Sequence, residues 1–301
     1  MALITYEDGN RLEDVLRTVV QVTPYDTPFL SYTPKTRAYN TLHEWPEDTL
    51  TTRADNAVIE GASFSYGTVT APSRITNVAQ IFEKTYNVSS TERWVRGAGV
   101  NDQFSYQEMK AVKELSTDVE HALLRGSRAT GNASVARRLA GMLNFVTTNS
   151  TAVASGTTLT ESFFNGMLED CWSAGGDPDC VYTGARLKRV ISTYTAGVTK
   201  NIEASGNKVI NSVETYESDF GLVKLKLSRD MPTTTNSDAG VLVCTTDTNY
   251  VAIGEPIRIL SREEVAQTLH GTNGVMRGEL TLEVRAERHN ADATGFDTSF
   301  V

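Results

Sequence analysis

The chain has 301 residues, with 28 lysines and arginines against 37 aspartates and glutamates, giving a formal net charge of -9. This length can hold one large domain or two ordinary ones around a substantial buried core. Hydrophobic residues make up 40% and charged residues 22%, which excludes a chain that is disordered by composition. The acidic charge argues against a sequence-specific nucleic-acid binder, because such proteins present a basic surface to phosphates.

The sequence shows no membrane or export segment and no cysteine framework. No apolar run approaches the roughly 20 residues that span a bilayer, and the N-terminus lacks the basic and apolar regions of a signal peptide. We therefore expect a protein that folds in a cytosol and has no membrane partner. The three cysteines, Cys171, Cys180 and Cys244, lack the spacing of a metal site, so we interpret them as reduced and mostly buried.

The first forty residues have the pattern of an arm. Pro24, Pro28 and Pro34 fall within eleven positions, and prolines at this density stop both helices and sheet ladders. Tyr25 and Phe29 lie between them. We expect such an arm to lie across its own domain or across a neighbouring subunit.

Residues 41–90 have the pattern of two strands that enclose a long excursion. The return limb, residues 78–89, alternates as a strand does, whereas the tip, residues 51–67, is polar and rich in small residues. The excursion has too few apolar residues to form a core of its own. Loops of this length are usually functional or bound to a partner.

A long helix is the strongest prediction in the chain. Its pattern begins near Asp102, with a capping box at Ser105 and Glu108, and ends at Gly126. At about 1.5 Å per residue it forms a rod of roughly 35 Å. Its apolar stripe consists of Met109, Val112, Leu115, Val119, Ala122 and Leu123. The charged side chains expected to face away are Glu108, Lys110, Lys113, Glu114, Asp118 and Glu120.

The rest of the chain mixes helices and strands, so the predicted fold class is α+β with two lobes. Helical patterns cover residues 159–173 and 184–195, and a polar linker at 149–158 marks a boundary. Strand patterns cover residues 180–182, 209–213, 223–227, 241–244 and 280–287. The last of these alternates most regularly and predicts a strand that is exposed on one face.

The candidates for acid–base chemistry are carboxylates in and beside the excursion, namely Glu44, Glu47, Asp48, Asp55 and Glu60. Hydrolysis by paired carboxylates needs two groups held rigidly across a substrate, and an exposed loop does not hold them so. We interpret them as solvated or inter-subunit charges, with a carboxylate-dependent hydrolase as an alternative. The four histidines lack ligand spacing, and neither a nucleophile elbow nor a phosphate-binding loop occurs. The sequence therefore predicts no enzyme, no metal and no cofactor.

One local basic cluster follows the long helix. Arg137 and Arg138 are adjacent, with Arg125 and Arg128 nearby. The cluster either contacts an acidic group on a neighbouring subunit or packaged nucleic acid, or is a solvated face after the helix.

The order of these parts resembles the Hong Kong 97-type (HK97-like) capsid fold of tailed-phage and herpesvirus shells, and in particular the major head proteins of long-tailed phages. The motifs that carry the resemblance are Thr27-Pro28-Phe29, Glu44-Trp45-x-x-Asp48-x-Leu50, Glu60-Gly61, Asn77-x-x-Gln80-Ile81, Lys113-Glu114-Leu115-x-x-Asp118-x-Glu120-x-Ala122-Leu123-Leu124, Ala136-Arg137-x-x-x-Gly141-Met142 and Glu279-x-Thr281-Leu282-Glu283-Val284. They run over nearly the whole chain, and their order carries the resemblance.

The resemblance implies a division of the chain into five parts. These are an N-terminal arm (1–40), an extended loop (41–90), a peripheral domain (91–154) with a spine helix at 102–125, an axial domain (155–270) and a return to the peripheral domain (271–301). The residues we expect at subunit interfaces are Tyr25, Pro28, Phe29, Trp45, Asp48, Arg53, Glu60, Arg74, Arg137 and Arg138.

The resemblance also implies a structural role. The chain would assemble with itself into hexamers and pentamers of an icosahedral bacteriophage head, contact packaged double-stranded DNA non-specifically, and meet a portal protein and any separate scaffold or decoration protein. It would reside in the virion capsid, and in the host cytoplasm during assembly. The alternatives are an encapsulin-like nanocompartment shell, the soluble hydrolase above, and another virion part such as a tail or decoration protein.

The extended loop differs from that of relatives whose subunits are covalently cross-linked through a lysine–asparagine isopeptide bond. It contains Arg53 and Arg74 but no lysine before Lys84 at its base. We therefore predict no covalent cross-linking between subunits. Boiling assembled particles in detergent should give a single monomer band, and a ladder of multimers would contradict this prediction.

Overall fold

The computed structural model describes residues 26–64, 66–95, 100, 102–194, 214–232, 239–245, 248–254, 261–264 and 270–297. Its helices are α1 (Pro28–Tyr32), α2 (Ser90–Trp94), α3 (Gln103–Arg125), α4 (Met142–Phe145), α5 (Glu161–Ser173), α6 (Ala185–Tyr194) and the 3-10 turn η3 (Glu287–His289). Its strands are β1 (Lys35–Ala38), β2 (Leu42–Glu47), β3 (Ser73–Val78), β4 (Gln80–Ser89), β5 (Ser150–Thr157), β6 (Cys180–Thr183), β7 (Thr215–Ser218), β8 (Gly221–Leu227), β9 (Ala239–Cys244), β10 (Asn249–Gly254), β11 (Ser261–Glu264), β12 (Gly271–Val284) and β13 (Ala291–Phe296). The α+β class is confirmed.

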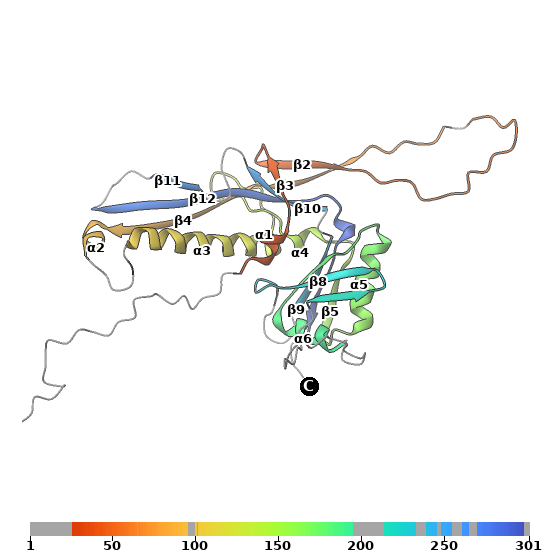
Figure 1. Cartoon of the computed structure of the whole chain (residues 1–301). Helices are drawn as coiled ribbons and strands as arrows, with labels where there is room; N and C mark the ends of the chain where they lie inside the picture. Colours follow the sequence, from red (N-terminus) through yellow and green to blue (C-terminus); the bar gives the residue numbers. More distant parts are fainter. Residues whose placement is uncertain are drawn as a thin grey trace, which may run out of the picture.

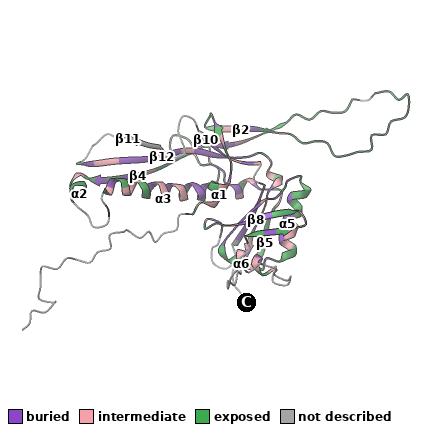
Figure 2. Cartoon of the chain, in the orientation of Figure 1, coloured by how far each residue is buried: buried purple, intermediate pink, exposed green. Residues whose placement is uncertain are grey.

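The elongated lobe consists of a long helix laid along a sheet (Figure 1). The sheet has the order β1-β10-β12-β11, and β4 pairs with β12 over ten antiparallel positions, from Gly271↔Ser89 to Leu280↔Gln80. α3 runs beside these two strands and buries one side against them (Figure 2). The predicted rod over residues 102–125 is thus confirmed.

The start and end of α3 are fixed by short-range polar contacts. Asp102 is the N-cap residue, and its carboxylate accepts hydrogen bonds from Phe104 N at 3.1 Å and from Ser105 Oγ at 2.7 Å. The predicted capping box, with Ser105 as the cap, is therefore wrong, because Asp102 occupies that position. At the other end the Gly126 amide donates to Ala122 O at 2.8 Å, and a side chain there would come within 2.4 Å of the same oxygen.

Two side chains on α3 depart from the predicted stripe. Met109 is 60% exposed although its spacing placed it in the apolar stripe, and Ala111 is buried instead. Glu120, predicted to face solvent, is fully buried. The reason for its burial is the short helix α1, whose free amide groups require an acceptor at this point of α3.

The compact lobe is built on a six-stranded sheet with the order β5-β13-β9-β6-β8-β7. α5 and α6 pack against this sheet through apolar side chains that include Phe164, Leu168, Leu187 and Ile191. The opposite side of β6 and β9, which carries Tyr182 and the cysteines of those strands, belongs to the same core cluster as the buried stripe of α3. All three cysteines are free and buried, as predicted.

The late strands pair across the divisions of the chain that the resemblance implies. β10 and β11 lie inside the predicted axial domain (155–270), yet they pair with β12 in the elongated lobe. β13 lies inside the predicted return segment (271–301), yet it fills the place between β5 and β9 in the compact lobe. Side-chain alternation identifies a strand but not the sheet that the strand joins, so the boundaries could not follow from the sequence.

The strand predicted to be exposed on one face is buried on both. All residues from Leu280 to Val284 in β12 are buried. Leu280, Leu282 and Val284 face the core with α3, whereas Thr281 and Glu283 lie beneath β2 and β3. The error arose because the polar face of β12 is covered by another hairpin rather than by water.

A buried carboxylate on β13 predicts a pH dependence of stability. Asp292 is 4% exposed, and its Oδ1 has no hydrogen-bond partner within the described residues. Burial raises the pKa of Asp292 from 3.8 to about 6, and a hydrogen bond from Ser150 offsets this only in part. Between pH 3.8 and about 6 the folded protein therefore keeps a proton on Asp292 that the unfolded chain releases. The contribution of Asp292 to the free energy of unfolding is full below pH 3.8 and is lost as the pH rises towards 6.

Asp292→Asn is expected to raise the free energy of unfolding near neutral pH by about 2 kcal/mol, because the uncharged amide avoids burying the carboxylate. Urea unfolding near pH 4 and near pH 7.5 checks the result, since the gain should be absent at the lower pH. Asp170→Asn, at an exposed position on α5, is the control and should change little. An equal effect at both pH values would contradict the assigned titration.

Candidate functional site

The most unusual surface is the loop between β2 and β3, residues 48–72, which projects away from both lobes (Figure 1). Every described residue in it is exposed (Figure 2). Its large apolar side chains are between 77% and 99% exposed, and these are Leu50, Val58, Ile59, Phe64, Tyr66 and Val69. A projecting loop on which the chain leaves six large apolar side chains unburied indicates an interaction site.

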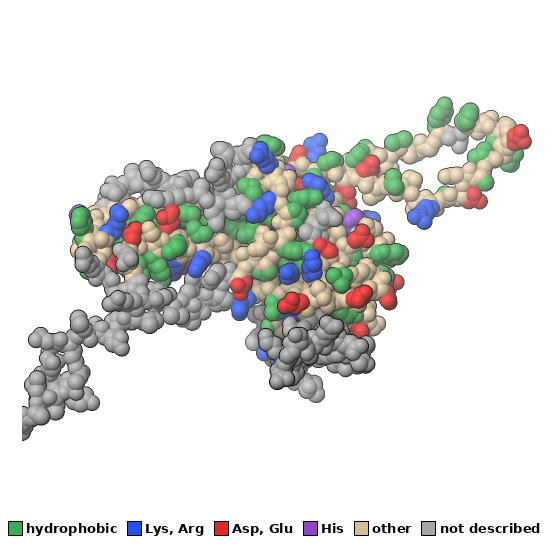
Figure 3. Space-filling view, viewed as in Figure 1, with side chains coloured by type: hydrophobic (Ala, Val, Ile, Leu, Met, Phe, Trp, Pro, Cys, Tyr) green, Lys and Arg blue, Asp and Glu red, His purple; other side chains and the backbone are tan. Residues whose placement is uncertain are grey.

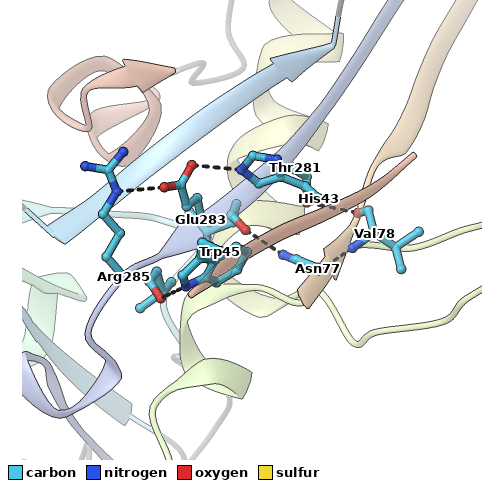
Figure 4. Close-up of polar contacts among 9 residues, drawn as sticks. His43, Trp45, Asn77, Val78, Thr281, Glu283 and Arg285 are labelled. Carbon is cyan, nitrogen blue, oxygen red and sulfur yellow. Dashed lines mark hydrogen bonds and ion pairs between the residues drawn. The ribbon is translucent and has the colours of Figure 1, made fainter. Parts of the chain in front are cut away.

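The base of this loop, which we call the loop root, is a rigid hairpin. β2 and β3 pair over six positions, from Leu42↔Val78 to Glu47↔Ser73. Trp45 on β2 is 5% exposed, and its indole Nε1 donates to Val284 O at 2.8 Å (Figure 4). The hairpin is therefore fastened to β12, and the direction in which the loop leaves the body is set by this attachment.

Asn77 on β3 joins three segments at the loop root (Figure 4). Its Nδ2 donates to Leu282 O at 2.8 Å and to Ala140 O at 3.1 Å, while its Oδ1 accepts from Val78 N at 2.8 Å and from Ala140 N at 2.9 Å. The side chain is fully buried. All of its hydrogen-bonding groups are thus used, which makes Asn77 the polar centre of the root.

An ionic group completes the root. Glu283 on β12 accepts from His43 Nε2 at 2.8 Å and from Arg285 Nε at 2.7 Å. Burial would raise the pKa of Glu283, but the hydrogen bonds from His43 and Arg285 outweigh it, and the pKa lies below its ordinary value. The Arg285 guanidinium also lies 4.0 Å from the centroid of the Tyr250 ring. Through its hydrogen bond to Glu283, His43 is a packing residue of the loop root.

The described part of the predicted arm is fixed to its own subunit. Phe29 of α1 is 1% exposed and meets the Tyr182 ring edge-on at 5.2 Å. The carboxylate of Glu120 accepts from Phe29 N at 2.8 Å and from Leu30 N at 2.7 Å. These are the free amide groups at the start of a helix, which a carboxylate satisfies well. α1 is therefore wedged between α3 and β6.

The basic cluster lies on the loop after α3. Arg137 Nη2 donates to Glu279 Oε1 at 3.0 Å, and Arg128 Nη2 donates to Thr76 Oγ1 at 2.7 Å. Arg125 and Arg138 are exposed. Part of the cluster thus holds the loop in place, and the rest faces outward.

The predicted interface residues fall into two groups. Phe29 and Trp45 are buried within the subunit, and Pro28 begins the anchored helix α1. Arg74 forms an exposed ion pair with Glu44 at 3.2 Å. The residues exposed on the projecting loop are Asp48, Arg53 and Glu60, while Tyr25 lies outside the described residues.

Sequence reasoning missed Asn77, Glu120 and Glu283 as organising residues. Asn77 follows a strand pattern, and nothing local distinguishes it from an exposed asparagine. Glu120 does carry a signal, because at helical spacing it falls beside the apolar positions Val119 and Leu123.

The described residues do not group into a metal site. No three His, Cys, Asp or Glu side chains of the described ranges are grouped so as to hold a metal ion. Glu44 lies on β2 and pairs with Arg74 on β3, whereas Glu60 lies on the projecting loop, so the structure does not bring these carboxylates together. In the same ranges no helix is long and apolar enough to cross a membrane.

The elongated lobe with its long helix, the compact lobe and the projecting loop define the class: this is the HK97-type capsid fold. A solved structure from Mycobacterium phage Ogopogo has a TM-score of 0.65 at 12% identity, covering 97% of this chain and 99% of the other. A capsid structure of Cyanophage A-1(L) has a TM-score of 0.65 at 12% identity, with 98% of each chain covered. The SrpI encapsulin of Synechococcus elongatus has a TM-score of 0.62 at 13% identity, with 100% and 98% covered.

The chain belongs to the SU10 major capsid protein family, whose profile matches residues 3–296. It is also 30% identical over 128 residues to the major capsid protein of Escherichia phage Phieco32, a match that spans 42% of this chain and 36% of that relative. The chain thus aligns with about a third of the length of this curated relative.

Proposed function

We propose that this chain is a structural subunit that assembles with itself into the icosahedral head shell of a tailed bacteriophage. The observation that carries the proposal is the loop of residues 48–72, which exposes six large apolar side chains on a rigid root. Such a loop costs solubility in an isolated subunit, whereas assembly would bury it. Family membership supports the same conclusion.

The proposal assigns parts to places in the shell. The elongated lobe is the peripheral domain, α3 is its spine, and the compact lobe is the axial domain at the centre of hexamers and pentamers. Residues 41–90 form the extended loop, and residues 1–40 form the arm that reaches a neighbour beyond the segment anchored at α1. The shell acts without catalysis or cofactor and contacts packaged DNA non-specifically.

The proposed partners are copies of this chain, a portal protein, and any separate scaffold or decoration protein. Assembly takes place in the host cytoplasm, and the final location is the virion capsid. Because each subunit repeats the same contacts around closed rings, weak individual contacts sum to a stable wall.

A nanocompartment shell is the second candidate, and the whole-chain similarity to the SrpI encapsulin favours keeping it. The two candidates differ in their contents. Particles that protect double-stranded DNA from nuclease inside infected cells support the phage head, whereas particles that enclose a protein cargo and no nucleic acid support the nanocompartment.

Negative-stain microscopy and light scattering of the purified chain test the proposal. We expect closed particles or capsomer-sized rings whose fraction rises with protein concentration. A monodisperse monomer at all salt and protein concentrations would contradict a shell function.

A further inference from the structure

A surface pocket of about 430 Å³ lies between the start of β4 and the loop after α3. Its apolar lining comes from Ile81, Val135 and Ala136, and Thr130, Gly131, Asn132 and Arg137 complete the wall. Ile81 is 48% exposed and Val135 is 52% exposed, so the subunit leaves these apolar side chains uncovered.

The wall of the pocket is held in shape by its own hydrogen bonds. The backbones of Ala129 and Arg138 exchange two bonds of 3.0 Å, and Asn132 Oδ1 accepts from Ser134 N and Val135 N at 2.8 and 2.9 Å. Gly131 has a φ of +74°, which a residue with a side chain rarely adopts. A preformed pocket binds without a large ordering cost.

The pocket and the projecting loop have complementary charge. Residues 125–141 contain four arginines and no acidic residue. Arg137 already pairs with Glu279, whereas Arg138 is exposed. The projecting loop, residues 48–72, contains three acidic residues and one arginine. Figure 3 shows apolar side chains along that loop with a few acidic side chains among them.

The tip of the loop presents an apolar side chain next to an acid. A turn closes from Ile59 O to Ala62 N at 3.1 Å, and Gly61 in this turn has a φ of +84°. Val58 and Ile59 are 77% and 85% exposed, and the exposed Glu60 follows them. One turn therefore carries both an apolar anchor and a negative charge.

The occupant of the pocket must come from a second copy. Each limb of the loop has about twelve residues and reaches up to roughly 40 Å from the root. Ile81 lies just after the end of β3 at Val78, so the pocket is beside the root of the same loop. The rigid root directs the loop away from the body (Figure 1), and the tip cannot return to its own pocket.

We propose that the tip turn of one copy docks on a second copy, with Ile59 in the pocket lined by Ile81 and Val135 and with the Glu60 carboxylate paired to Arg138. This inference rests on the proposed shell function and names the surface that receives the loop. The contact is heterologous, so it repeats head-to-tail around a closed ring.

Cysteine cross-linking tests the proximity directly. A full-length chain carrying Ile59→Cys and Val135→Cys should, after assembly and mild oxidation, give a ladder of disulfide-linked multimers on a non-reducing gel. The native cysteines are 0% to 2% exposed and should not contribute. The control pair Leu50→Cys and Val135→Cys, with the loop cysteine near the root, should give no ladder.

Charge exchange tests the polar part. Glu60→Arg alone and Arg138→Glu alone should each lower particle yield about tenfold, since a small loss per contact is multiplied around the shell. The double variant should recover yield to within about threefold of wild type, because the pair is restored with opposite sense. Asp170→Arg, the same charge change at an exposed position on α5, is the control and should leave the yield near wild type.

The outcomes separate the inference from the proposed function. Three outcomes would overturn the docking site and leave the shell function standing. The first is that the wild-type chain forms particles but the variant with Ile59→Cys and Val135→Cys gives no ladder. The others are equal ladders from the test and control pairs, and no recovery of yield in the charge-exchanged double variant. A wild-type chain that never assembles would refute the shell function and this inference with it.

Discussion

Asn77→Ala is expected to lower the free energy of unfolding by about 3–5 kcal/mol, the largest effect of any single substitution proposed for this chain. The substitution removes the side-chain partner of four buried backbone groups: the amides of Val78 and Ala140 and the carbonyls of Ala140 and Leu282. It also leaves a cavity at a fully buried position. Urea unfolding of the full-length chain measures the loss.

Asn87→Ala is the matched control. Asn87 lies on the exposed face of β4 and bonds only to the side chain of Asn273 among the described contacts. Its replacement should cost no more than about 0.5 kcal/mol. Equal costs for the two variants would show that the loop root does not depend on the hydrogen bonds of Asn77.

Asn77→Asp separates the donors from the acceptors. The aspartate keeps both acceptor contacts but places a carboxylate oxygen against Leu282 O and Ala140 O in place of the donor. We expect a cost similar to that of Asn77→Ala, because a buried charge then faces two carbonyl groups. A nearly silent Asn77→Asp substitution would mean that the donor contacts contribute little.

Glu120→Ala is expected to lower the free energy of unfolding by about 2–4 kcal/mol and to release α1 from α3. The variant removes the only acceptors found for Phe29 N and Leu30 N among the described contacts. Hydrogen exchange at these two amides should accelerate in step with the release. Asp118→Ala, an exposed carboxylate on the same helix, is the control. Slow exchange at Phe29 and Leu30 in the Glu120 variant would contradict the anchoring role.

The same carboxylate gives a pH dependence with a definite sign. Burial raises the pKa of Glu120 from 4.5 to about 7, against the lowering effect of the hydrogen bonds from Leu30 and Phe29. The folded protein therefore holds a proton that the unfolded chain has lost between pH 4.5 and 7, and the stabilisation present below pH 4.5 disappears as the pH rises towards 7. In the Glu120→Gln variant, the fall in the free energy of unfolding between pH 4.5 and 7 should be smaller by about 3 kcal/mol. An unchanged pH profile would assign the titration to another group.

The local patterns in the sequence were sufficient for the elements that depend on neighbours along the chain. α3, a helix of 23 residues, was predicted to within a residue at each end, since an apolar stripe and a terminal glycine are both local signals. The projecting loop was predicted for the opposite reason, because residues 48–72 contain no apolar periodicity that could give them a core. Neither prediction requires knowledge of what the segment packs against.

Long-range contacts decided the rest. The assignment of β10, β11 and β13 to their sheets depended on strand pairing across the chain. Expected interface residues such as Phe29 and Trp45 proved to be buried in their own subunit, because exposed and buried aromatic residues look alike in a sequence.

The fold class, the long helix and a loop that the subunit cannot bury all follow from patterns along the chain. The way in which that loop is held depends on contacts between distant segments. Asn77 and Glu283 are polar residues in strands, and their burial became clear only when β2 and β3 were seen lying over β12. A polar side chain is stable in the interior only if partners distant in the chain satisfy it, and no local pattern specifies those partners.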